Sequence, residues 1–188
     1  WRELGRWSWY VLEGSREHRT RIITAYNVGG NKTECYGSVY QQHIRYLQHK
    51  GIEKTPRQLF REDLLRQLDT WVKQGDRIIL IMDANEHILD GPLCRELCNQ
   101  RLGLGLVEIS HTIWDGEAPN TYLNGWKPID GIWCSDLLEV QGITMLPFSS
   151  SVGDHRSMIF DITTRSLIGK FERKVVPAGC RRLSTANK

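Results

Sequence analysis

Three short polar motifs lie at the ends of hydrophobic, strand-like runs of the sequence. The first two directly follow the apolar segments 78–82 and 128–129, and the third comes just before the apolar segment 158–160. Side chains at a strand end lie at the rim of a sheet, where binding and catalytic groups concentrate. Two carboxylates, an amide and an Asp–His pair at one rim are the groups that metal-assisted hydrolysis of a phosphoester requires. The motifs are Asp83-Ala84-Asn85, Asp130 and Gly153-Asp154-His155.

Each of these side chains has a property that such a hydrolysis needs. An ionised Asp83 can orient or deprotonate a water molecule, and the amide of Asn85 can donate a hydrogen bond to a phosphoryl oxygen. His155 can bind a phosphoryl oxygen or transfer a proton, and Asp130 is the candidate carboxylate that orients its ring. Asp154 supplies a hard oxygen ligand, which suits Mg²⁺ or Mn²⁺. An Asp-x-Asn motif alone is also typical of a turn, so the prediction depends on all three motifs in this order.

The apolar pattern predicts the elements that position these motifs. Thr55 and Gln58 form a capping-box signature at the start of a helix with an apolar stripe from Phe60 to Val72. Strands outnumber helices, and two helices come early, which indicates an α+β or layered α/β/α domain and not a Rossmann repeat. We expect strands near 7–12, 21–26, 77–82, 106–109, 120–123, 129–134, 143–146 and 157–162, and helices over 38–50, 55–74 and 92–102.

Four tryptophans have two interpretations each. Trp7 and Trp9 alternate along a strand, which indicates a buried strand face or an edge that is left uncovered. Trp114 and Trp126 could stack on nucleic-acid bases, but packing in a core or a loop is the favoured interpretation.

The motifs together resemble those of the endonuclease/exonuclease/phosphatase superfamily, whose members include DNase I-like enzymes, abasic-site endonucleases, lipid phosphatases and endonucleases of mobile elements. The resemblance covers roughly residues 6–164 and implies a four-layered α/β sandwich with the motif ends clustered at one rim. It rests on the segments Arg21–Tyr26, Ile79–Asn85, Asn120–Tyr122, Pro128–Trp133 and Gly153–Ser157.

The resemblance implies a role for each matching residue. It makes Asp83 the water-activating carboxylate and Asn85 a ligand of the phosphate or the transition state. It places Asp154 beside the metal and His155 against the phosphate, with Asp130 orienting His155. The implied cofactor is Mg²⁺ or Mn²⁺. Among the family's substrates nucleic acid is preferred over a lipid headgroup, because the basic residues after 164 suit a polyanion.

The sequence also departs from the family pattern. Tyr26 is an expected phosphate contact, and Asn27 follows it directly where the family places its polar residue further on. The family's first strand carries an Asn and the next segment carries the main metal-binding Glu, and both would precede Trp1. We therefore expect residues 1–164 to form a partial sandwich of DNase I-like type that lacks its N-terminal strands.

Composition gives weaker constraints. Residues 165–188 carry seven basic residues and one acidic residue, whereas the preceding 164 residues are net acidic. This basic C-terminal tail could contact nucleic acid, or it could be a solvated terminus. The five cysteines follow no disulfide or zinc-site spacing, which favours reduced thiols in an intracellular protein of the nucleus or cytoplasm. No segment has the length and apolar character of a membrane span or a signal peptide.

Three functions are compatible with these observations. The sequence favours a divalent-metal-dependent phosphodiester hydrolase, most simply a DNA or RNA endonuclease. The first alternative is a catalytically incomplete remnant that acts at most as a nucleic-acid-binding module, because the metal-binding Glu is not matched. The second alternative is a phosphatase for small substrates, which would differ mainly in the loops around the rim.

Overall fold

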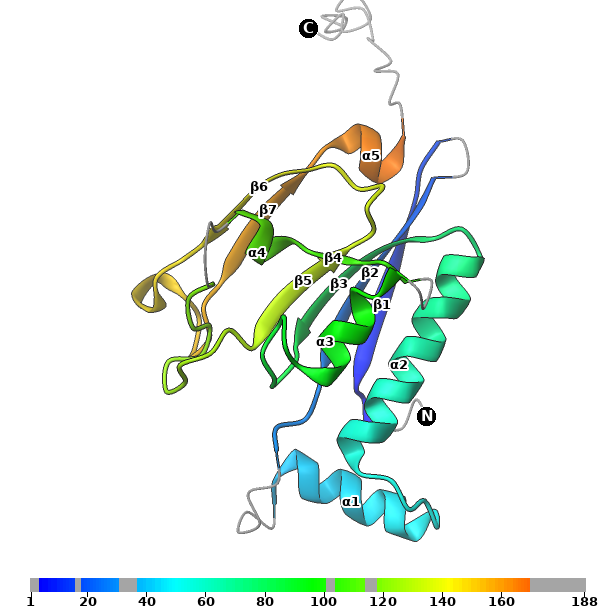
Figure 1. Cartoon of the computed structure of the whole chain (residues 1–188), viewed down its shortest axis with the longest axis vertical. Helices are drawn as coiled ribbons and strands as arrows, with labels where there is room; N and C mark the ends of the chain where they lie inside the picture. Colours follow the sequence, from blue (N-terminus) through cyan, green and yellow to red (C-terminus); the bar gives the residue numbers. More distant parts are fainter. Residues whose placement is uncertain (1–3, 16–17, 31–36, 101–103, 114–117, 170–188) are drawn as a thin grey trace, which may run out of the picture.

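The computed structural model describes residues 4–15, 18–30, 37–100, 104–113 and 118–169, without the side chains of residues 111 and 113. These residues form an α+β fold built on a five-stranded mixed sheet in the order β1-β2-β3-β5-β4 and a second, two-stranded sheet (Figure 1). The main sheet consists of β1 (Trp7–Glu13), β2 (Arg19–Tyr26), β3 (Arg77–Asp83), β5 (Asp130–Cys134) and β4 (Val107–Glu108).

The first half of the chain builds a hairpin and a parallel crossover. β1 pairs antiparallel with β2, and β2 pairs parallel with β3. A parallel pair needs a long connection, and here α1 (Val39–His49) and α2 (Pro56–Lys73) provide it. Because β2 and β3 run in the same direction, their last residues, Tyr26 and Asp83, are neighbours at one end of the sheet.

The expected start of α2 is confirmed. The Thr55 side chain accepts a hydrogen bond from the Gln58 amide, while the Gln58 side chain accepts one from the Thr55 amide. Such a reciprocal pair satisfies two amides that the first turn of a helix otherwise leaves without partners. The apolar stripe of α2 is buried against the sheet, together with α3 (Pro92–Leu97). Its fully or largely buried members are Phe60, Leu64, Leu68 and Trp71.

Strand β3 has buried side chains on both of its faces. Ile78, Leu80 and Met82 pack with α2 and α3, whereas Ile79 and Ile81 pack on the opposite face. This alternation follows from the two-residue period of a strand.

The second sheet covers that opposite face. It consists of β6 (Val140–Met145) and β7 (Met158–Ile162), and it packs there with α4 (Ile109–Ile113) and α5 (Thr164–Ile168). In Figure 1, α2 (cyan) lies on one side of the main sheet, and β6 and β7 (yellow and orange) lie on the other, whereas α1 lies below the lower end of the sheet. The described residues thus form three layers, and the expected α+β partial sandwich is confirmed.

Some expected elements have different bounds. Residues 120–123 do not form a strand, and only Tyr122 makes an isolated bridge, to His155. The reason is local, because the Asn120 amide donates to the carbonyls of Tyr122 and Gly125 and so stabilises a turn instead. Helix α3 ends at Leu97, whereas residues 101–102 of the expected helix lie outside the described residues.

The β1–β2 hairpin is tied to the last described helix. The Thr20 hydroxyl donates to the Leu167 carbonyl at 2.6 Å, and the Ser15 amide donates to the Ile168 carbonyl at 2.8 Å. These bonds join the two ends of the described chain, and Figure 1 shows α5 beside the tip of the hairpin.

The described cysteines and helices can be compared with the expectations from composition. Cys94, Cys98 and Cys134 are free thiols, whereas Cys35 and Cys180 lie outside the described residues. Among the described helices, none is both long and apolar enough to cross a membrane. Most of the expected basic tail, from residue 170 on, also lies outside the described residues.

Candidate active site

The strand ends bring two predicted carboxylates together. Asp83 and Asp130 are directly opposed partners in the antiparallel register of β3 and β5. Tyr26 is the parallel partner of Asp83, so these three residues lie at the same end of the sheet, which is called the rim below. Tyr26 is exposed there, whereas Asp83 and Asp130 are half-buried.

His155 reaches the rim from the loop that precedes β7. Its Nδ1 lies 2.8 Å from Oδ2 of Asp130, so an ionised Asp130 accepts the Nδ1 proton and fixes the ring orientation. The Tyr122 ring lies 5.1 Å from the imidazole, and their isolated bridge holds the two backbones together. Burial alone lowers the pKa of His155, but the hydrogen bond to Asp130 and the neighbouring carboxylates outweigh it, so the pKa is raised.

The carboxyl group of Asp83 has a raised pKa. Burial raises its pKa to about 6, and the negative charge of Asp130 contributes in the same direction. The hydrogen bond from the Asn85 amide and the positive charges of His155 and Arg57 oppose this shift. A carboxylate with a pKa near neutrality can both accept and release a proton at physiological pH, which suits a general base.

The turn after Asp83 has an unusual backbone conformation. Asn85 has a φ of +49°, a left-handed conformation in which Asn is among the more tolerant residues. Its amide donates to Oδ1 of Asp83 at 3.0 Å, and its side chain donates to the Asn27 carbonyl at 2.8 Å. The Asn27 side chain in turn donates to the Ala84 carbonyl at 2.9 Å. These reciprocal bonds hold the predicted motif beside the end of β2.

The structure places Asn27 inside the turn and not on its surface. The residue is almost completely buried, so it contacts Ala84 and Asn85 more readily than a large substrate. Its Oδ1 has no hydrogen-bond partner among the described residues.

Arg57 has a role at this turn that no sequence pattern indicates. Its guanidinium donates to the carbonyls of Val28, Ala84 and Asn85 at 2.9, 3.4 and 3.2 Å, and to Oε2 of Glu86 at 2.7 Å. The planar guanidinium can donate in several directions at once. Arg57 therefore links the start of α2 to both loops at the rim.

Thr121 positions the second carboxylate. Its fully buried hydroxyl oxygen accepts the backbone N–H groups of Ile129 and Asp130 at 2.9 and 3.0 Å. This contact fixes the start of β5 and therefore the position of Asp130. The resemblance placed the segment around Thr121 near the site, but the sequence did not indicate this bond.

Asp154 and Trp126 lie on the outside of the site. Asp154 is exposed next to His155, where its charge contributes to the raised pKa of the imidazole. Trp126 has 81% of its surface exposed, so the expectation that it packs in a core or loop was wrong. The Lys127 ammonium lies 4.2 Å from the centre of the Trp126 ring. Trp114 lies outside the described residues.

The rim provides a donor set that suits a divalent cation. One ligand atom each from Asp83, Asp130 and His155 lies within 4.8 Å of the others. Two carboxylate oxygens match the preference of Mg²⁺ and Mn²⁺ for hard ligands, whereas an imidazole nitrogen is more typical of Zn²⁺, Cu²⁺, Fe²⁺ and Ni²⁺ sites. Asp154, the ligand expected from the sequence, is not part of this group of three.

The comparisons with known proteins give little beyond the overall shape. No protein-family model matches the chain, and no curated protein matches it. Among solved structures, the chain is similar to the human Nocturnin catalytic domain, a structure with a bound sulfate anion, at 14% sequence identity and a TM-score of 0.48. The alignment covers 84% of this chain and 61% of that chain, so this chain spans less than two thirds of the length of its structural neighbour.

Proposed function

We propose that this chain is a divalent-metal-dependent phosphodiester hydrolase that acts on nucleic acid. The observation that carries the proposal is the meeting of Asp83, Asp130 and His155 at the rim, with the His155–Asp130 hydrogen bond at 2.8 Å. No feature of strand packing requires two opposed carboxylates at the end of a ladder, and like charges placed opposite each other destabilise a sheet.

The side chains at the rim have complementary roles in this reaction. Asp83, with its raised pKa, accepts a proton from the attacking water. Asp130 holds the His155 ring so that Nε2 is the nitrogen that contacts the phosphoryl oxygen. The Asn85 side chain is held at the same turn by the Asn27 carbonyl, and we assign it to the phosphoryl group on the strength of its predicted role.

A divalent cation would be held by the carboxylates of Asp83 and Asp130, with the exposed Asp154 as a further oxygen donor. When bound, such an ion supplies Lewis-acid stabilisation of negative charge on the phosphate.

A nucleic-acid substrate is supported by an exposed surface formed by residues close in sequence to Asp130. Exposed aromatic side chains next to a cation are suited to base stacking and phosphate binding, and Trp126 with Lys127 forms such a pair close in sequence to Asp130. A small phosphomonoester would not need this surface, which makes the phosphatase alternative less favourable.

Nicking of supercoiled plasmid DNA in Mg²⁺ or Mn²⁺ tests the proposal. We expect nicking that disappears in EDTA and falls at least about a hundredfold in Asp83→Asn and in His155→Ala, the range found for loss of a general acid or base. Asp136→Asn and His49→Ala are matched controls, because both residues are exposed and lie outside the rim group. Circular dichroism must show that every variant is folded.

The alternatives have different outcomes. A folded chain that binds an oligonucleotide but does not nick DNA or RNA would be a catalytically incomplete binding module. Release of inorganic phosphate from a small monoester, without nicking, would identify a phosphatase. Nicking that survives both rim variants would move the activity elsewhere and contradict the proposed site.

A further inference from the structure

Strand β1 has one edge that no described strand pairs with. It lies at the end of the strand order, and its only partner is β2. The Tyr26 amide donates a hydrogen bond to the Arg6 carbonyl, so Arg6 and every second residue after it direct their backbone groups toward β2. In an antiparallel pair every second residue directs its N–H and C=O away from the partner, and here these residues are Trp7, Trp9 and Val11. Such an edge is a template for another extended chain.

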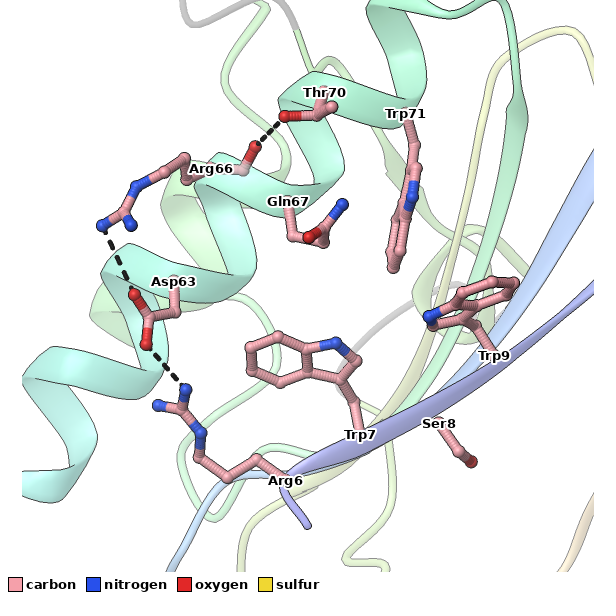
Figure 2. Close-up of a pocket in the computed structure, with 9 residues that line it drawn as sticks. All are labelled: Arg6, Trp7, Ser8, Trp9, Asp63, Arg66, Gln67, Thr70 and Trp71. Atoms are coloured by element: carbon pink, nitrogen blue, oxygen red, sulfur yellow. Dashed lines mark hydrogen bonds and ion pairs between the residues drawn. The ribbon is translucent and has the colours of Figure 1, made fainter. Parts of the chain in front are cut away.

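A groove runs along this edge. It has a volume of about 790 Å³ and lies between β1 and the exposed flank of α2. Figure 2 shows Trp7 and Trp9 projecting from β1 toward α2, with Trp71 facing Trp9. The ring centres of Trp9 and Trp71 are 5.8 Å apart, and Trp7 packs at the same distance against Phe60. The groove therefore has a rigid aromatic wall beside a row of backbone donors and acceptors.

The charge of the groove favours an acidic occupant. Arg6 and Arg66 line it with a single carboxylate, Asp63, between them (Figure 2). The Arg6 side chain is 2% exposed and donates from Nη2 to Asp63 at 2.6 Å, and the exposed Arg66 lies 3.3 Å from the other oxygen of the same carboxylate. Two guanidinium groups and one carboxylate give the groove an excess of one positive charge, which favours an occupant that brings a carboxylate.

We propose that this groove binds an extended acidic segment of a partner protein, which adds to the sheet as a strand beside β1. Main-chain bonds to Trp7, Trp9 and Val11 would provide affinity, as in other cases of strand addition. The aromatic wall would select apolar side chains on one face of the segment, and Arg6 and Arg66 would select a carboxylate. A second copy of this chain fits less well, because its β1 carries a carboxylate only at its last residue, Glu13, and none at the centre of the strand.

The test uses the full chain and a blocked eight-residue peptide of alternating threonine and valine with one central glutamate. We expect the peptide to slow hydrogen exchange at the amides of Trp7, Trp9 and Val11 at least tenfold. The amides of Ser8 and Tyr10 serve as internal references, because the alternation directs them toward β2. The same peptide with a central lysine should bind at least tenfold more weakly, and an N-methylated peptide should not bind.

Two variants make the test independent of the peptide chemistry. Val11→Pro removes an amide that points away from β2, so the hairpin is retained and binding should be lost, whereas Val11→Thr should bind like the parent chain. Arg66→Glu should shift the preference toward the lysine peptide, since the exposed Arg66 faces the groove.

Several results would overturn the proposal. Slow hydrogen exchange at the amides of Trp7, Trp9 and Val11 in the chain without peptide would mean that the edge is already paired. If this protection from exchange rises with protein concentration, the strand that pairs with the edge belongs to a second copy. If it is independent of concentration, that strand belongs to the same chain. Equal binding of the glutamate and lysine peptides, or protection at other sites, would also contradict it. None of these residues belongs to the rim, so the test does not depend on the proposed activity.

Discussion

Asp83 and Asp130 are the last directly opposed pair of the β3–β5 ladder, and both are carboxylates. The same pairing that holds the two strands together therefore holds two like charges side by side in a half-buried place. The raised pKa of Asp83 follows from this arrangement, and so do the first two predictions.

Replacing Asp83 with Asn should stabilise the protein at alkaline pH while abolishing activity. The folded-state pKa of Asp83 is raised from 3.8 to about 6, so ionising the group above pH 6 destabilises the folded state. After allowance for solvent screening, we expect Asp83→Asn to gain roughly 1–2 kcal/mol at pH 8 and nothing below about pH 4. Urea unfolding of both proteins in EDTA across this pH range measures the difference.

The control for that measurement is Asp136→Asn, which changes an exposed carboxylate away from the rim. It should leave the pH dependence of the unfolding free energy unchanged. A gain for Asp83→Asn that stays constant down to pH 4 would show that charge is not the cause.

The imidazole of His155 should titrate above its ordinary pKa of 6.5 in the metal-free protein. Because the shift is upward, the stabilisation from the pair with Asp130 is present below pH 6.5 and is lost as the pH rises through the folded-state value. Asp130→Asn should bring the His155 pKa below 6.5, because burial then acts with less opposition. NMR titration in EDTA tests this, with His155→Ala to assign the resonance. An unchanged titration in Asp130→Asn would contradict the assigned pairing.

Arg57 should act as a positioning residue for the turn that carries Asp83. Loss of its bonds to Val28, Asn85 and Glu86 should let the turn shift, and small displacements of catalytic groups cost about a hundredfold in rate. If the nicking activity is established, we expect Arg57→Gln to lower kcat about ten- to a hundredfold with a smaller change in KM. Arg57→Lys should restore only part of it, because an ammonium cannot match the planar guanidinium.

Arg61→Gln provides the matched control for Arg57. It lies one turn further along α2 and makes a long ion pair of 3.8 Å with Glu96. Equal loss of activity in both variants would point to a general effect of helix charge.

Trp126→Ala should weaken binding of a single-stranded oligonucleotide by about 1–3 kcal/mol, the range for one base–aromatic stack. The fold should be unaffected, since most of the Trp126 side chain is exposed. Fluorescence anisotropy with a labelled oligonucleotide measures the change. Tyr10→Ala removes another exposed aromatic side chain, located on β1, and should bind like the parent chain.

The sequence predicted most of the elements that place the site. The uninterrupted apolar run of β3, the capping box of α2 and the motif at each strand end are local signals, and the structure has these elements within a few residues of the expected bounds. The meeting of Asp130 and His155 was inferred from their positions at strand ends and from the family resemblance.

Other parts of the site have no local signal. Arg57 contacts residues 27 to 29 positions away, and nothing in the start of an ordinary capped helix indicates that its guanidinium is directed to the rim. The exposure of Trp126 depends on how the loop before β5 lies over the sheet. The turn at 120–123 was mistaken for a strand, because one Asn120 side chain outweighs the apolar pattern around it.

The bond between Thr20 and Leu167 has a consequence for how the site is made. It joins residues 147 positions apart in the sequence. β7 and the loop that carries His155 come shortly before Leu167 in the chain. During synthesis from the N-terminus, β1, β2 and β3 emerge long before the Thr20–Leu167 bond can form. His155 therefore meets Asp130 only in a late stage of folding. The carboxylate pair at the rim can therefore form before its histidine is available, and the group of Asp83, Asp130 and His155 is complete only when nearly all of the described residues have left the ribosome.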